Sequence, residues 1–186
     1  MEIIKFVNGM LRENCYVVYN NKSCIIIDPG MAYKDVINFA NQKRLTILAI
    51  LLTHGHFDHI WNCYLFKKEG AKIYIHTLDA DKCEDNLKNL SGRNSNLVTF
   101  VPNVLLEGKE ADFNIGDFSI KMLHTPGHSR GSVTYIVDNY IFTGDTMFEN
   151  TYGRTDFYDG NIDEMFNSLN LLRKYVDNGY ILCPGH

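Results

Sequence analysis

Long apolar runs are missing from this chain of 186 residues. A membrane-spanning helix needs about 18 apolar residues in a row, and the longest run here, residues 47–52, is only long enough for a strand. Residues 1–6 alternate like a strand and lack the charged start and apolar stretch of a signal peptide. We therefore expect neither a membrane segment nor a membrane partner.

Cysteines are few, and their pattern does not fit disulfide bonds. The five cysteines are odd in number, far apart and mostly surrounded by apolar residues. A disulfide framework is typical of shorter chains with an even cysteine count. We interpret these thiols, including Cys63, as small core residues and expect a reducing, cytoplasmic location.

Basic clusters are also missing. The 18 lysines and arginines are spread along the chain, no basic block is longer than two residues, and the net charge is -4. A basic patch is the usual sign of a nucleic-acid-binding surface, so we expect no nucleic-acid partner. The sequence gives no indication of the oligomeric state.

The chain has no internal repeat and no Pro/Ser-rich linker, so we expect one domain over residues 1–186. Hydrophobic periodicity predicts its elements. Strands are expected at residues 2–7, 15–19, 23–28, 46–52, 72–76, 111–115, 118–124, 132–137, 140–143 and 180–183. Helices are expected at residues 33–44, 58–68, 78–90 and 162–176, with a loop rich in Asn, Ser and Gly at 91–103. This order indicates an α+β fold with two packed sheets and helices outside.

Three histidines and one aspartate lie within six positions, in the run His54-Gly55-His56-Phe57-Asp58-His59. The run directly follows the strand expected at 46–52, whose continuous apolar sequence is typical of burial on both faces. His54 and His56 are two residues apart at a strand end, so their imidazoles point the same way. Asp58 and His59, at the start of the expected helix, would point toward a second position nearby. Such ligands suit zinc, or else iron or manganese. A helix-capping role for Asp58 would leave the three histidines unexplained.

Three further polar residues each follow a predicted strand and come directly after a glycine: His128, Asp145 and His186. Glycine is expected where the backbone is crowded. Taken alone, each Gly-His or Gly-Asp dipeptide would indicate a turn. Together with the histidine run, their repeated placement favours one shared site.

The chain resembles the metallo-β-lactamase-fold hydrolases and, within them, the glyoxalase II-like branch. The histidine run marks the superfamily, and residues 153–156 (GRTD) point to the branch. The other matching motifs are residues 13–16 (ENCY), 28–30 (DPG), 125–129 (TPGHS), 143–146 (TGDT) and 184–186 (PGH). The resemblance implies a four-layer αββα sandwich of two mixed sheets packed face to face with helices outside.

The resemblance also implies two divalent metal ions. The ligands would be His54, His56 and His128 for the first, Asp58, His59 and His186 for the second, and Asp145 as a bridge. A bridging carboxylate resembles the thioesterase branch, whereas true β-lactamases have a different residue there. We therefore expect hydrolysis of a small hydroxyacyl thioester by a water that the two metals activate.

Two departures from the family bear on the substrate. Full glyoxalase II enzymes grip glutathione with a C-terminal helical domain, for which this chain has no room, so another small thiol is an open alternative. The family's chains also continue past the last motif, so we expect a further segment after His186.

Three other interpretations stay open. The ligand set resembles that of a sulfur dioxygenase with one iron, and a lactonase is a further candidate. The third is a metal-binding module without catalysis. A hydrolase that uses a metal-activated water does not need a serine nucleophile.

Four residues near the motifs are candidates for support or substrate contact: His124, Arg154, Phe57 and Tyr152. His124 would either support a ligand through a ring N–H or be a core histidine. Arg154 is expected to pair with Asp156, with contact to a substrate anion as the alternative. The rings of Phe57 and Tyr152 would either line a pocket or pack against neighbouring side chains without a role in binding.

Overall fold

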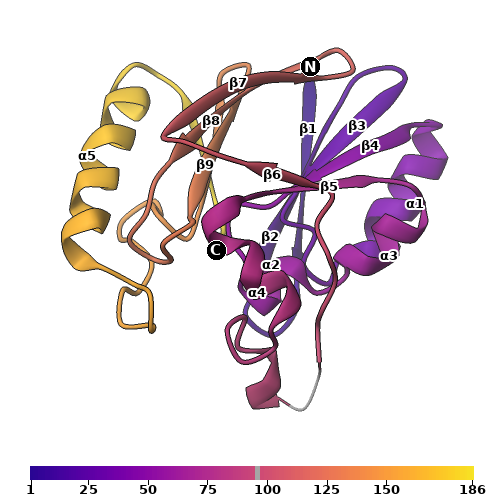
Figure 1. Cartoon of the computed structure of the whole chain (residues 1–186). Helices are drawn as coiled ribbons and strands as arrows, with labels where there is room; N and C mark the ends of the chain where they lie inside the picture. Colours follow the sequence, from indigo (N-terminus) through magenta and orange to yellow (C-terminus); the bar gives the residue numbers. More distant parts are fainter. Residues whose placement is uncertain (95–96) are drawn as a thin grey trace.

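The computed structural model describes residues 1–94 and 97–186, which form two mixed β-sheets packed face to face (Figure 1). The strands of the first sheet, in spatial order, are β1 (Glu2–Asn8), β2 (Glu13–Tyr19), β3 (Ser23–Ile27), β4 (Thr46–Leu51), β5 (Lys72–His76) and β6 (Val104–Leu106). Neighbours from β1 to β3 pair antiparallel, and those from β3 to β6 pair parallel.

The second sheet completes the sandwich. Its strands, in spatial order, are β11 (Ile181–Pro184), β10 (Tyr140–Gly144), β9 (Val133–Val137), β8 (Phe118–His124) and β7 (Glu110–Ile115). β10 and β11 pair in parallel, and the other neighbours pair antiparallel. The carboxyl ends of β10 and β11 therefore meet at one edge.

Helices cover the outer face of each sheet. α1 (Tyr33–Lys43) and α3 (Cys63–Lys68) pack on the first sheet, and α5 (Ile162–Asp177) packs on the second (Figure 1). In α5 the buried residues recur at helical spacing, for example Met165, Leu169 and Leu172. The predicted four-layer αββα sandwich is confirmed.

Burial of β4 on both faces explains its continuous apolar sequence. Ile50 belongs to the core between the first sheet and its helices, whereas Ala49 and Leu51 belong to the core between the two sheets. Tyr135 of β9 reaches across, and its hydroxyl donates to the carbonyl of Leu52 at 3.0 Å. The strand that leads into the histidine run is thus held from both sides.

The continuous helix predicted at 58–68 is wrong. The structure has α2 (Phe57–Ile60) and α3, with a break at Trp61 and Asn62. The N–H of Asn62 donates to the carbonyl of Gly30 at 2.9 Å, so the turn after β3 packs into the break.

The helix predicted at 78–90 is also too long. It consists of the 3-10 turn η1 (Thr77–Asp79) and α4 (Ala80–Glu84). Asp85 ends it because its backbone is extended and its carboxylate accepts from the N–H groups of Leu87 and Lys88 at 2.9 and 3.2 Å.

The loop predicted at 91–103 contains the 3-10 turn η2 (Ser91–Asn94), and its residues 95–96 lie outside the described residues. β6 was not predicted, because its three residues are too few to show alternation. All five cysteines are free and buried, as predicted. Within the described ranges, no helix is long and apolar enough to cross a membrane.

The first testable prediction concerns the α3 layer. Phe66 is fully buried against the first sheet, whereas Tyr64 on the same helix is 44% exposed. We expect Phe66→Ala to lower the free energy of unfolding by about 3–5 kcal/mol through the cavity it leaves, and Tyr64→Ala to lower it by less than about 1 kcal/mol. Urea unfolding of both variants measures this, and equal losses would contradict the packing described.

Candidate metal centre

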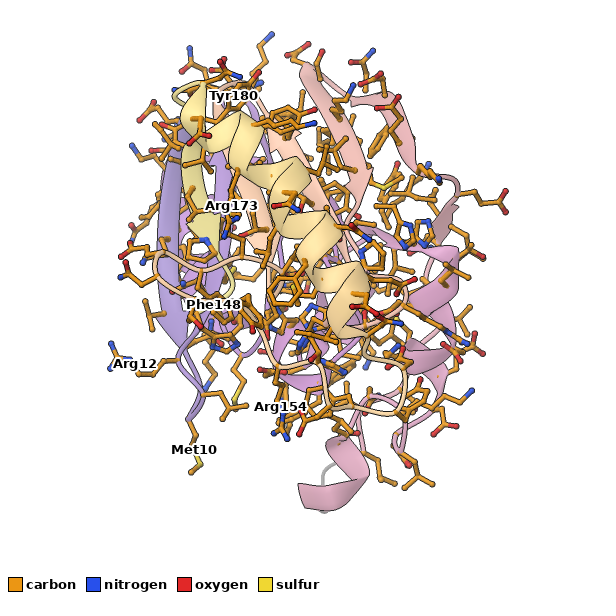
Figure 2. The ribbon with its side chains drawn as sticks, turned by 90° about the vertical axis from the view of Figure 1, so that its left-hand side faces the viewer. Met10, Arg12, Phe148, Arg154, Arg173 and Tyr180 are labelled. Atoms are coloured by element: carbon orange, nitrogen blue, oxygen red, sulfur yellow. The ribbon has the colours of Figure 1, made fainter. Side chains whose placement is uncertain are left out.

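The candidate ligands come from four segments that each follow a strand. Residues 54–59 follow β4, His128 lies between β8 and β9, Asp145 follows β10 and His186 follows β11. Arg154, whose carbonyl binds His128, lies at the lower end of the molecule in Figure 2, as do Met10 and Arg12, and Tyr180 lies at the opposite end. The fold thus brings residues from distant parts of the sequence to one end of the sandwich.

The first cluster consists of His54, His56 and His128. Their ligand atoms lie within 4.8 Å of one another, and the three side chains are at most 3% exposed. His128 donates through Nδ1 to the carbonyl of Arg154 at 2.8 Å. Its Nε2 faces the centre, 2.9 Å from Nδ1 of His56.

The second cluster consists of Asp58, His59 and His186, whose ligand atoms also lie within 4.8 Å of one another. His186 donates through Nδ1 to the carbonyl of Leu11 at 2.9 Å, which turns its Nε2 toward the centre. That Nε2 faces a carboxylate oxygen of Asp58 at 3.4 Å. Burial would lower the pKa of His186, but the hydrogen bond to Asp58 and the charge of Asp145 raise it overall, so without a metal this nitrogen holds a proton toward the carboxylate.

Asp145 lies between the two clusters. Its Oδ2 is 3.4 Å from Nε2 of His128, and its Oδ1 is 3.3 Å from Nε2 of His59 and 3.6 Å from Nε2 of His186. One carboxylate thus presents a different oxygen to each cluster.

The donor set fits divalent cations. Buried atoms without a hydrogen-bond partner include Nε2 of His54, His56 and His59 and Oδ1 of Asp145. Buried polar atoms are normally satisfied, and imidazole nitrogens with carboxylate oxygens are the ligands of zinc and related metals. Imidazole nitrogens and carboxylate oxygens grouped in this way fit a divalent cation, which would replace the protons held there. The chain binds divalent metal ions through this cluster.

Two histidines of the first cluster, His54 and His56, are held neutral. Burial, reinforced by the neighbouring imidazole of His128, lowers the pKa of His56 to about 3. Burial, followed by the charges of His59 and His56, holds the pKa of His54 well below its usual range. Both rings therefore keep a lone pair for a metal at neutral pH.

The second cluster carries the negative charge. Burial raises the pKa of the Asp145 carboxyl, but His59 more than offsets it, and the pKa is lowered overall. Burial would lower the pKa of His59, but Asp145, Asp58 and Asp28 together raise it well above its usual range. This environment attracts cations, and in the absence of a metal a proton is held there.

Asp28 is a supporting residue that the sequence analysis did not single out. Its Oδ1 accepts from the N–H of Thr53 at 2.8 Å, and its Oδ2 accepts from the Thr53 hydroxyl at 2.6 Å and from Nδ1 of His59 at 3.0 Å. Asp28 also lies within ligand distance of His54 and His59, but its oxygens are occupied by these bonds. It orients His59, and the signal for it was the Asp-Pro-Gly turn after β3.

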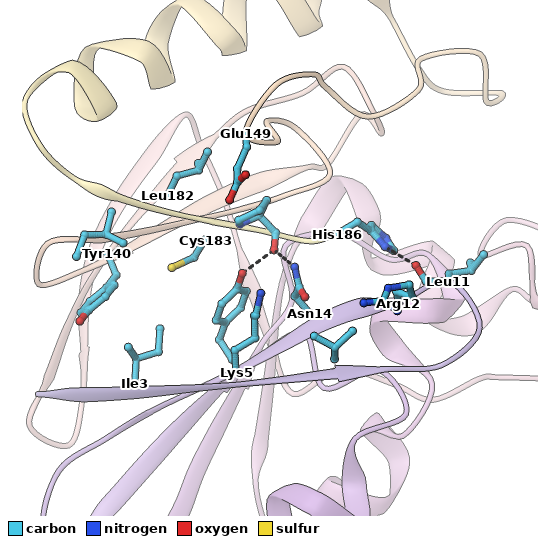
Figure 3. Close-up of a pocket in the computed structure, with 14 residues that line it drawn as sticks. Ile3, Lys5, Leu11, Arg12, Asn14, Tyr140, Glu149, Leu182, Cys183 and His186 are labelled. Atoms are coloured by element: carbon cyan, nitrogen blue, oxygen red, sulfur yellow. Dashed lines mark hydrogen bonds between the residues drawn. The ribbon is translucent and has the colours of Figure 1, made fainter.

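His186 is held in place through the residues before it (Figure 3). The carbonyl of Pro184 accepts from the side chains of Asn14 at 3.0 Å and Tyr16 at 2.8 Å. The N–H of Asn14 donates to the carbonyl of Gly185 at 2.8 Å. β2 of the first sheet therefore fixes the position of a residue that follows the second sheet.

His124 supports a loop. It donates through Nε2 to the carbonyl of Arg130 at 2.8 Å, and its ring stacks on His76 with centroids 4.5 Å apart. It thereby steadies the segment that carries His128. His76 accepts from the N–H of Leu78 and thereby caps the start of η1.

Arg154 pairs with Asp156 through two contacts of 2.6 Å, which confirms the predicted pair. Tyr152 packs edge-on against Phe166 of α5, with centroids 5.8 Å apart. Phe157 was missed by the sequence analysis, yet its ring lies 4.8 Å from that of His56 and 5.5 Å from that of His128.

Phe57 lines a cavity of 470 Å³ that adjoins the second cluster. The other lining residues are Asn8, Gly9, Met10, Leu11, Glu13, Met31, Asp58 and Trp61. Asp58 belongs both to this cavity and to the second cluster, so the cavity lies beside the candidate metal centre.

Residues 8–186 match a family model described as the metallo-beta-lactamase superfamily. The chain is 36% identical to the probable metallo-hydrolase YqgX of Bacillus subtilis, over 96% of this chain and 86% of that protein. It is 27% identical to the hydroxyacylglutathione hydrolase GloC of Haemophilus influenzae, over 94% and 85%. It is 26% identical to the probable polyketide biosynthesis zinc-dependent hydrolase BaeB of Bacillus velezensis, over 98% and 76%.

Two solved structures are similar over almost the whole chain. The B3 metallo-beta-lactamase BLEG-1 superposes with a TM-score of 0.90 at 33% identity, covering 100% of this chain and 91% of that one. TTHA1623 in a di-iron-bound form superposes with a TM-score of 0.80 at 30% identity, covering 98% and 91%.

The second prediction concerns metal content. Because two clusters share one carboxylate, we expect elemental analysis of the purified protein to give about two divalent ions per chain. His124→Ala should leave this number unchanged, whereas Asp145→Ala should lower it. A single iron with no second metal would contradict the dinuclear arrangement and favour the dioxygenase.

Proposed function

This chain belongs to the metallo-beta-lactamase superfamily as a metal-dependent hydrolase, and we propose that it hydrolyses small 2-hydroxyacyl thioesters with two metal ions, as in the glyoxalase II-like branch. The observation that carries the proposal is the position of Asp145. Its two oxygens face the two clusters separately, as a carboxylate that bridges two metals would.

Seven residues would hold the metals. They are His54, His56 and His128 for the first, Asp58, His59 and His186 for the second, and Asp145 for both. Bound divalent ions supply Lewis acidity that polarises a carbonyl oxygen and lowers the pKa of a water. Zinc is the proposed metal, supported by the zinc-dependent relative BaeB. Iron remains an alternative because TTHA1623 holds two irons, and manganese fits the same ligands.

The chain's own residues would orient the reactants. The side chain of Asp58 is 14% exposed and lies at the boundary between the cavity and the second cluster, where its free oxygen can accept a proton from the attacking water. Thr53 and Asp28 fix the ring directions of His54 and His59. Phe157 covers the first cluster, which helps to exclude competing water.

The cavity beside Asp58 would hold the acyl group. Met10, Met31 and Trp61 give it a mainly apolar wall, and its volume of 470 Å³ suits a small ligand. A carbonyl placed at its inner end would lie next to Asp58. This supports a small acyl group whose reacting end meets the metal centre.

The thiol portion would be held weakly. Recognition of a charged tripeptide normally takes several cations that converge on its carboxylates, and Arg154 is engaged by Asp156. The relative GloC, named a hydroxyacylglutathione hydrolase, supports the acyl-thioester class.

A second candidate function is hydrolysis of a β-lactam ring. It is favoured by the likeness to BLEG-1, named a B3 metallo-beta-lactamase. The carboxylate of Asp145 between the clusters favours the thioester instead. Side-by-side turnover of a thioester and a chromogenic cephalosporin separates the two, and a homoserine-lactone substrate tests the lactonase.

The third prediction concerns Asp58. We expect Asp58→Ala to lower kcat/KM for a lactoyl thioester by at least about 100-fold, because one change removes a ligand and the group that orients the water. Asp35→Ala, an exposed carboxylate in the first turn of α1, is the matched control and should keep full activity. Near-normal turnover by the Asp58 variant would show that the second cluster is not catalytic.

The fourth prediction concerns the thiol. If the acyl group supplies most of the binding energy, replacing glutathione by a short neutral thiol should raise KM while kcat is maintained. Steady-state hydrolysis of lactoyl-glutathione and of the same acyl group on the short thiol measures this. A preference for the glutathione ester above about 100-fold, roughly 2.7 kcal/mol, would reveal a specific glutathione site.

A further inference from the structure

A buried ionic chain lies behind the histidine run. It consists of Asp79 at the end of η1, Lys82 in α4 and Asp159 in the segment before α5. Asp79 and Lys82 are 0% exposed. The ammonium of Lys82 is 2.8 Å from Asp79 and 2.5 Å from Asp159. Burial of charged groups is costly unless they are paired and hydrogen-bonded, so the burial of these three charged side chains needs a structural explanation.

Asp79 binds two separate ligand-bearing segments at once. Its Oδ2 accepts from the N–H of Gly55 at 2.9 Å and from the hydroxyl of Ser129 at 2.8 Å. Its Oδ1 accepts from the N–H of Gly131 at 2.9 Å and from Lys82. Gly55 lies between His54 and His56, and Ser129 follows His128. One carboxylate therefore connects the segments that carry the whole first cluster.

The packing around this carboxylate leaves little room for adjustment. A Cβ atom at Gly55 would lie 2.6 Å from the Cβ of Lys82, and one at Gly131 would lie 2.5 Å from the backbone nitrogen of Asp79. Both separations are shorter than atoms tolerate, so both glycines let the backbone rest directly against η1 and α4.

Asp159 extends the buried ionic chain to a third segment of the protein. It accepts from the N–H of Arg130 at 3.3 Å as well as from Lys82. It lies two residues after Phe157, whose ring contacts His56 and His128. The ionic chain thus also fixes the aromatic cover of the first cluster.

We propose that Asp79, held by Lys82, is a positioning residue that sets the spacing of His54 and His56 relative to His128 and thereby the affinity of the first cluster for its metal. This inference rests on the ligand set of the proposed function. It adds residues that contact neither metal nor substrate and act through Gly55 and Ser129.

The test measures metal affinity, which does not depend on the substrate. Zinc binding is followed by competition with a chromogenic chelator for the wild type, Asp79→Asn and Ser129→Ala. Asp79→Asn keeps the shape of the side chain but loses its charge, and Ser129→Ala removes only one hydrogen bond. We expect the affinity for one of the two zinc ions to fall at least 10-fold in Asp79→Asn and about 3-fold in Ser129→Ala, with the second ion unaffected.

Controls separate positioning from general stability. Asp112→Asn removes an exposed carboxylate near Lys121, the same change of charge at a remote site, and should leave both affinities unchanged. Urea unfolding of the metal-free proteins measures stability. The triple variant Asp79→Asn/Lys82→Met/Asp159→Asn removes all three charges of the buried ionic chain and should recover stability without recovering zinc affinity.

Three outcomes distinguish the hypotheses. Wild-type zinc affinity in both Asp79→Asn and Ser129→Ala would overturn the inference, even if Asp79→Asn unfolds more easily. Recovery of zinc affinity together with stability in the triple variant would also overturn it. A wild type that binds two zinc ions but hydrolyses no thioester would contradict the proposed function and leave the positioning role intact.

Discussion

Imidazole rings and carboxylates that converge on one small volume are the constraint on which this structure depends. His128 and His186 each donate one ring N–H to a backbone carbonyl, so their other nitrogens face the centre. There they meet the carboxylates of Asp58 and Asp145 at 3.4 to 3.6 Å. Carboxylates this close together repel one another unless a metal ion or a protonated imidazole lies among them, so the fold must hold these groups in place.

Two buried carboxylates, one for each cluster, help to keep the ligand residues in position. Asp28 fixes His59 and the start of the histidine run through Thr53. Asp79 joins the same run to the segment after β8. Both carboxylates have their hydrogen bonds filled by backbone, hydroxyl or ring donors, so they remain part of the scaffold while the less satisfied carboxylate of Asp145 stays available.

The main features of the fold and the candidate ligands could be predicted because they depend on local patterns. The apolar run 47–52 indicated a strand buried on both faces, and β4 has this environment. Asp79 and Lys82 could not be found in the same way, since a charged residue in a polar helical stretch is normally exposed. Their burial follows from the packing of η1 and α4 behind the histidine run, which no local pattern encodes. The break between α2 and α3 has the same origin, because it depends on contact with Gly30.

Four of the seven candidate ligands lie within six consecutive residues, whereas the other three are 69 to 127 residues further along the chain than His59. The short run can therefore capture a metal ion in an unfolded or newly synthesised chain, before the second sheet has formed. Metal that binds the unfolded chain stabilises the native state by less than its native affinity would imply. The remaining ligands join only when β8 to β11 dock, so the complete metal centre forms only in the folded sandwich. Metal supply during synthesis would then influence how this chain folds as well as whether it is active.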